Sequence, residues 1–148
     1  MLADGKSRRI NERRPSALWV RILCRETNES SWEELSHVND ISISGACFST
    51  INSLIVGQLL QLTLPMPREL RLYDHQLPEY QIWAVVRSIK PSAKRTLGLP
   101  RMEVGVAFAG REPPASFQLD PTTLYDLLPT PTRQGTWQLR QRPRRADF

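Results

Sequence analysis

Prolines and glycines interrupt this chain so often that long helices are excluded from most of it. The 148 residues include 12 prolines and 7 glycines. Proline lacks a backbone N–H donor and ends a helix, and glycine marks turns. Between these breaks, apolar and polar residues alternate in short runs, most cleanly over 102–108. Such alternation is typical of strands with one buried face, so the sequence predicts an all-β fold.

Six segments carry this pattern. Their expected ranges are 17–24, 32–38, 46–50, 57–64, 80–89 and 102–108. Short connections between six strands favour a closed or nearly closed antiparallel barrel, because closure leaves no long bare edge. Asp120 followed by Pro121 predicts a short helix over 122–128, since these residues suit the cap and the first helical position. Residues 68–79 are expected to be an irregular excursion and residues 91–101 a turn region.

The positive charge lies at the two ends of the chain. The net charge is +5, of which residues 1–14 carry +3 and residues 133–148 carry +4, so the rest is close to neutral. We expect one domain over 15–128, a flexible segment over 1–14 and a disordered Pro/Arg-rich tail over 129–148. Basic tails attract phosphates or acidic partners. A nucleic-acid binder that uses these tails is therefore one alternative.

Several functional classes find no support in the sequence. No apolar run reaches the ~20 residues that span a bilayer, and the polar start lacks a secretion signal, so a cytoplasmic location is expected. Cys24 and Cys47 are expected to be reduced strand residues. His37 and His75 are too isolated for a metal site. No nucleophile–base pair or phosphate-binding glycine loop is recognisable, so neither an enzyme nor a cofactor is expected.

Two short motifs concentrate the candidate ligand-binding residues. Arg9 and Arg13 form an R-x-x-x-R pair, directly preceded by Arg8, in the segment before the first strand. A D-x-S-x-x-G motif runs over 40–45. The same arginine spacing recurs at positions 21/25 and 140/144, where a strand face and a tail favour solvated side chains. Asp, Ser and Gly also dominate β-turns, so the second motif alone predicts only a turn.

Taken in this order, the two motifs resemble the signature of the PilZ family, and V-G-V-A-F at 104–108 is similar to the family's late strand. The resemblance covers roughly residues 8–110. It implies a six-stranded antiparallel β-barrel with a short C-terminal helix. It also implies a receptor for the bacterial second messenger cyclic di-GMP, which acts in trans on a protein partner in processes such as motility or biofilm formation. The implied ligand-binding residues are Arg9, Arg13, Asp40, Ser42 and Gly45, with Arg8, Arg14, Ser44 and Arg87 as further candidates.

The chemistry of cyclic di-GMP suits these residue types. The ligand carries two phosphates and two guanines, and a guanidinium can pair with guanine O6 and N7, stack on a base or clamp a phosphate. The carboxylate of Asp40 can accept from the guanine N1–H and N2–H₂ edge, and Ser42 can bond a phosphate or a base edge. Gly45 permits a positive φ and close backbone approach. Arg8 is similar to the family variety that binds a stacked pair of dinucleotides.

Other interpretations stay open at this stage. A PilZ-fold adaptor that binds no ligand is a second alternative, because some family members lack the arginines. The tryptophans at 19, 32 and 83 lie in expected strands, where packing is favoured over base stacking. Trp137 lies in the basic tail, where an exposed indole would suit a partner surface. The oligomeric state and the number of dinucleotides bound per chain are not determined by the sequence.

Overall fold

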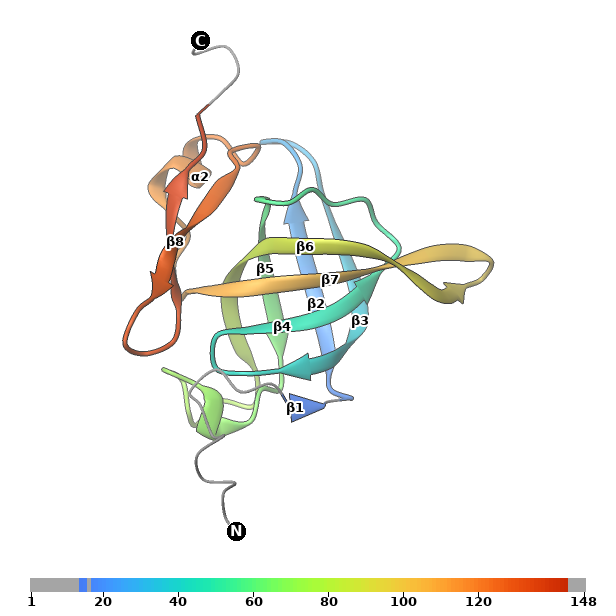
Figure 1. Ribbon diagram of the computed structural model, residues 1–148, viewed down its shortest axis with the longest axis horizontal. Coiled ribbons are helices and arrows are strands. Elements are labelled where there is room, and N and C mark those ends of the chain that lie inside the picture. Colours follow the sequence, from blue (N-terminus) through green and yellow to red (C-terminus); the bar gives the residue numbers. More distant parts are fainter. Residues whose placement is uncertain (1–13, 16, 144–148) are drawn as a thin grey trace.

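Six strands close into an antiparallel barrel, as the sequence predicts (Figure 1). The computed structural model describes residues 14–15 and 17–143. The barrel strands are β2 (Trp19–Arg25), β3 (Ser31–Ile41), β4 (Gly45–Thr50), β5 (Leu59–Leu64), β6 (Tyr80–Thr96) and β7 (Leu99–Gly110). They follow the order β3-β2-β5-β6-β7-β4, and pairing of β3 with β4 closes the ring. A two-residue strand, β1 (Arg14–Pro15), pairs with the end of β3.

The barrel interior is filled by one face of each strand. Val20, Ile22 and Cys24 of β2 are fully buried, and the residues between them are half-buried or exposed. Phe48 and Phe108 occupy the same core. Burying each large apolar side chain stabilises the fold by about 1.5–3 kcal/mol. The two cysteines are both free and lie in strands, as expected.

The hairpin of β6 and β7 is longer than the sequence predicts. The expected turn region over 91–101 is instead the paired far end of these two strands, which projects beyond the barrel (Figure 1). Pro91 and Pro100 suggested a break, but both are accommodated in the hairpin, opposite Met102 and Arg95 respectively. The pairing of β7 with β4 ends at Met102, which faces Thr50. Beyond that point no other described strand pairs with the hairpin, so no ladder partner needs a proline N–H.

The short helix lies before Asp120 and not after it. Helix α2 spans Ala115–Leu119, so the prediction of a helix over 122–128 is wrong. The carboxylate of Asp120 accepts hydrogen bonds from the backbone N–H and the hydroxyl of Thr122, at 3.0 and 2.6 Å. This is a local turn that looks like a helix cap in sequence. The following residues extend and pair as a strand.

The C-terminal segment folds back on the barrel. Strands β8 (Tyr125–Pro131) and β9 (Trp137–Gln141) form a hairpin that begins within the expected helix and continues into the tail expected from residue 129 onward. The expectation of disorder is therefore wrong over residues 129–141. The hairpin and α2 cover an apolar patch on the outside of the barrel. The buried residues of this contact are Leu59, Val85 and Ala107 of the barrel, Phe117 of α2 and Tyr125 of β8. A second, smaller core therefore lies outside the barrel wall.

A buried arginine organises the excursion between β5 and β6, which includes the 3-10 turn η1 (Arg68–Leu70). The Arg71 guanidinium donates to the carbonyls of Met66, Asp74 and Leu77 at 2.6–2.8 Å. Satisfying three backbone acceptors from one side chain fixes a loop whose only regular structure among the described residues is η1.

None of the helices in residues 14–15 and 17–143 has the length and apolar character needed to span a membrane.

Candidate functional site

The D-x-S-x-x-G motif forms the connection between β3 and β4. Ser42 is fully buried, and its hydroxyl accepts from the backbone N–H groups of Ser44 and Gly45, both at 3.2 Å. The Ser42 N–H in turn donates to the Gly45 carbonyl at 2.9 Å. The hydroxyls of Ser42 and Ser44 lie 3.2 Å apart. The motif is thus a turn closed by its own serine, and this turn joins the two strands that close the barrel.

Gly45 does not need the left-handed backbone that we expected for it. It begins β4 in register with Ala107 of β7. Among the described residues, the glycines with positive φ are Gly57, Gly98, Gly110 and Gly135. Gly45 is buried, and its backbone N–H and carbonyl both bond to Ser42. Gly45 therefore completes this hydrogen-bonded ring through its backbone.

Asp40 lies on the outer surface of the barrel, beside a register shift. The pairing of β3 with β4 slips between Val38 and Asp40, and Asp40 then faces Cys47. A bulge of this kind re-aims side chains. The same cross-strand row continues from Cys47 to Gly105 of β7 and on to Ser88 of β6. Gly105 has no side chain, and the Ser88 hydroxyl lies 2.7 Å from the position that a Cβ of Gly105 would occupy, so Ser88 fills the outer side of this row at Gly105.

The N-terminal arginine segment enters the structure at this same place. Strand β1 pairs Arg14 with Ile41 and Pro15 with Asp40. Arg8, Arg9 and Arg13 lie outside the described residues, and only the backbone of Arg14 is described. The register nevertheless places the backbone of Arg14, the residue directly after the arginine motif, at the end of β3. That point is directly beside the D-x-S-x-x-G turn, although the two motifs are far apart in sequence.

Arg87 lies elsewhere on the barrel wall. It sits at a register shift of β6 between Val86 and Ser88, with β7 and β4 separating it from the strand that carries Asp40. Its guanidinium carbon lies 4.9 Å from the centroid of the Trp137 ring, a cation–π arrangement. The structure therefore pairs Arg87 with the C-terminal hairpin. A role for Arg87 in ligand binding stays a prediction.

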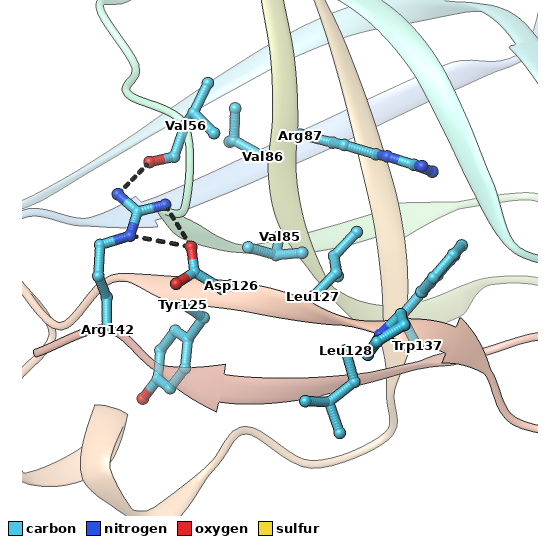
Figure 2. A pocket seen from close by; sticks show the side chains of 11 residues that line it. Val56, Val85, Val86, Arg87, Tyr125, Asp126, Leu127, Leu128, Trp137 and Arg142 are labelled. Atoms are coloured by element: carbon cyan, nitrogen blue, oxygen red, sulfur yellow. Dashed lines mark hydrogen bonds and ion pairs between the residues drawn. The ribbon is translucent and has the colours of Figure 1, made fainter.

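A pocket of about 400 Å³ opens between β6 and the C-terminal hairpin (Figure 2). Arg87 and Trp137 line it on one side (Figure 2). On the other, Arg142 donates to the Asp126 carboxylate at 2.8 and 3.0 Å and to the Val56 carbonyl at 3.3 Å. Sequence reasoning missed this pocket because it depends on folding of the expected tail. The one available signal was Trp137, which is half-buried in the structure.

The described part of the chain shows no cluster of three or more His, Cys, Asp or Glu residues that could hold a metal ion. The candidate site consists of a polar turn and an outer-surface carboxylate, with β1 paired beside them. These groups can bind an anionic, hydrogen-bonding ligand. A protein-family model, that of the PilZ domain, matches residues 7–119 of the chain.

The chain belongs to the PilZ domain family. The match includes both the arginine motif and the D-x-S-x-x-G turn, so the resemblance seen in the sequence is confirmed.

Solved structures similar to this PilZ domain come from several bacteria. The PilZ domain of YcgR from Escherichia coli, solved with c-di-GMP, has 18% sequence identity and a TM-score of 0.47, and the match covers 76% of this chain and 86% of that one. For the Bacillus subtilis inhibitor of motility MotI/DgrA the identity is 23% and the TM-score 0.45, over 76% and 46% of the two chains. For the MrkH–c-di-GMP complex of K. pneumonia the values are 19% and 0.44, over 72% and 46%.

These similarities concern the fold. This PilZ domain spans less than half the length of the MotI/DgrA and MrkH chains that it matches. No curated protein matches the sequence.

Proposed function

We propose that this PilZ domain is a receptor that binds cyclic di-GMP at the β3–β4 turn and does not transform it. The observation that carries the proposal is the pairing of β1 with β3, in which Pro15 faces Asp40. This register supports the proposal because it puts Arg14, which directly follows the arginine motif in sequence, beside the strand end that carries Asp40. Arginine forks, a carboxylate and a small-residue turn are the groups that suit guanine edges and phosphates.

The ligand would lie over the outer row that runs from Asp40 past Cys47 toward Gly105. The guanine N1–H and N2–H₂ edge would donate to Asp40, and a phosphate would contact the turn at its half-buried residue Ile43, because the Ser42 hydroxyl is fully buried. Arg9 and Arg13 would close over the opposite side of the dinucleotide. Arg8 adds a third guanidinium, which would help to offset the four phosphates of a stacked ligand pair.

Closure of the arginine segment would be the signal. Ordering of the segment that precedes β1 over the ligand would create a surface that did not exist before, and an effector protein acting in trans would recognise it. In backbone NMR spectra, we expect resonances of residues 5–15 to shift on ligand addition. Unchanged resonances with saturated binding would contradict this mechanism.

Calorimetric titration of cyclic di-GMP into the full chain tests the binding proposal. We expect saturable binding to the native protein that Arg9→Ala and Asp40→Ala abolish. Arg21→Ala is the matched control, because Arg21 is exposed in β2 and belongs to an unrelated R-x-x-x-R pair; it should bind as the native protein does. The measured stoichiometry decides between one dinucleotide and a stacked pair.

Two other outcomes would redirect the proposal. Absence of binding at both low and high salt would favour a PilZ-fold adaptor that binds no ligand. Binding that falls steeply with salt, that any polyanion competes for and that Asp40→Ala leaves intact would favour nucleic-acid binding by the basic ends of the chain.

A further inference from the structure

The far end of the β6–β7 hairpin is a projecting finger, defined here as residues 90–101 (Figure 1). The tip pairs Thr96 with Leu99, so the turn consists of Leu97 and Gly98 alone. Their φ angles are 52° and 80°. Two consecutive positive φ values are the mark of a type I′ turn, for which Asn-Gly and Asp-Gly are the preferred sequences.

Leucine is an unfavourable residue at this tip for two independent reasons. Its side chain has no polar group that could form a local hydrogen bond in the left-handed conformation, which costs most L-residues roughly 1 kcal/mol or more. It is also 97% exposed, and the neighbouring Leu99 is 50% exposed. A Cβ added at Gly98 would meet no atom within 4 Å, so the tip stands in open space. Neither folding nor solubility explains this leucine, and a strained exposed residue points to function.

The finger carries charge of only one sign. Lys90, Lys94, Arg95 and Arg101 lie in it, and residues 88–102 contain no Asp or Glu. The first acid along β7 is Glu103, which faces Lys90 at the base of the finger. Lys94 and Arg95 are exposed close to the apolar tip. The combination is a convex apolar point with cations directly behind it.

The finger is fixed to the barrel and not a loose loop. The guanidinium of Arg101 donates to the Ser36 hydroxyl at 3.0 Å and to the Ser49 carbonyl at 3.1 Å, and pairs with Glu34 at 3.4 Å. Another nitrogen of the same group donates to the Thr96 hydroxyl at 2.6 Å. One side chain thus ties the tip region to β3 and β4. A tip that is already fixed in place loses less conformational entropy on binding than a flexible loop does.

We propose that this finger docks the protein on an anionic lipid surface. Leu97 and Leu99 would enter the boundary between headgroups and acyl chains, and Lys94 and Arg95 would lie among the phosphates. A fluid lipid layer accepts a convex apolar tip without a preformed pocket, whereas a protein partner must supply one. The cations on the finger favour anionic lipid over neutral lipid. This inference is independent of cyclic di-GMP binding.

Co-sedimentation of the full chain with lipid vesicles tests the proposal. We expect binding to vesicles of phosphatidylglycerol and phosphatidylcholine and much weaker binding to phosphatidylcholine alone. Leu97→Asn should weaken binding about tenfold or more, because it removes the inserting side chain. Asn tolerates the turn conformation, so the variant should melt at or above the native temperature. The double variant Lys94→Gln/Arg95→Gln should also weaken binding by about tenfold or more.

Leu119→Asn is the matched control. Leu119 is 81% exposed at the end of α2, away from the finger, and its replacement should leave vesicle binding unchanged. Leu97→Asn binding as tightly as the native protein would overturn the proposal, since the basic ends of the chain would then suffice. Equal binding to neutral vesicles would also overturn it. If vesicles do not bind but Leu97→Asn abolishes capture of a protein partner, the finger is a protein contact and the lipid proposal fails.

Discussion

At the scale of single residues, Ser42 combines two roles that experiments must separate. Its hydroxyl closes the β3–β4 turn by accepting from two backbone N–H groups, and in the proposed function the same turn faces the ligand. Loss of ligand binding in a Ser42 variant would therefore not identify a ligand contact. Asp40, on the outer row, is the better probe of ligand recognition.

Ser42→Ala is expected to destabilise the protein without any ligand present. The substitution leaves two buried N–H groups without their acceptor, which costs about 1–3 kcal/mol. Urea unfolding of the native and variant proteins measures this difference. Ser53→Ala is the control, because Ser53 is exposed and its replacement should change stability by no more than about 0.5 kcal/mol. Equal stability of Ser42→Ala and the native protein would refute the structural role of the hydroxyl.

The two cysteines should differ in reactivity. Burial raises the pKa of the Cys24 thiol from its ordinary value of 9.0 to about 11, helped by the nearby Glu26 carboxylate and opposed by the hydrogen bond from Gln58. Because the folded pKa lies above the unfolded one, keeping this thiol neutral stabilises the fold below pH 9 and ceases to do so as the pH rises through 11. Since the thiolate is the reactive form, Cys24 should resist modification at pH 8, at roughly 0.1% thiolate.

Cys47 provides the contrast and a test of the ligand position. It is half-buried on the outer row between Asp40 and Gly105. A thiol reagent should modify Cys47 in the folded protein, and Cys24 only in denaturant, as mass spectrometry would show. Saturating cyclic di-GMP should slow modification of Cys47. Equal rates with and without bound ligand would place the dinucleotide elsewhere.

At the scale of elements, the C-terminal hairpin is part of the folded domain. Trp137 packs against the outer apolar cluster and beneath Arg87. Trp137→Ala should therefore destabilise the protein by about 2 kcal/mol, less than for a fully buried tryptophan. Gln138→Ala, on the exposed side of β9, is the control. Thermal unfolding that fails to distinguish the two variants would show that the hairpin contributes nothing to the fold.

The elements that the sequence predicts correctly are those whose pattern is local. Alternation identified the six barrel strands, because each buries one face against the same core. It did not identify β9, because Arg and Gln alternate with apolar residues in this strand and the sequence alone resembles a basic tail. The apolar face of β9 is buried only after it packs against the outer cluster. Asp120 failed as a helix cap for a related reason. Its side chain makes the same bond to Thr122 in a turn as in a cap, and only the later pairing of β8 decides between them.

At the scale of the whole molecule, the candidate site coincides with the place where the barrel closes. The two motifs are far apart in sequence, and only the pairing of β1 with β3 brings Arg14, which directly follows the first motif, beside Ile41 of the second. Contacts of this kind join distant parts of the chain, and no local pattern encodes them. In the proposed function, the ligand would bridge β1, β3 and β4 and so stabilise the closure itself.

Bound ligand should accordingly raise the melting temperature of the entire domain. At a ligand concentration of 100 Kd, binding to the folded state alone adds about 2.7 kcal/mol, which corresponds to a rise of about 5–10 °C for a domain of this size. Differential scanning fluorimetry with cyclic di-GMP measures the shift. Cyclic di-AMP is the matched control ligand, because it keeps the two phosphates but lacks guanine O6 and the N2–H₂ group from which Asp40 would accept a hydrogen bond. Arg9→Ala should melt as the native protein does without ligand and show no shift with it. Equal shifts with both dinucleotides would mean that the site recognises phosphates alone, and the assignment of Asp40 as the guanine-reading residue would fail.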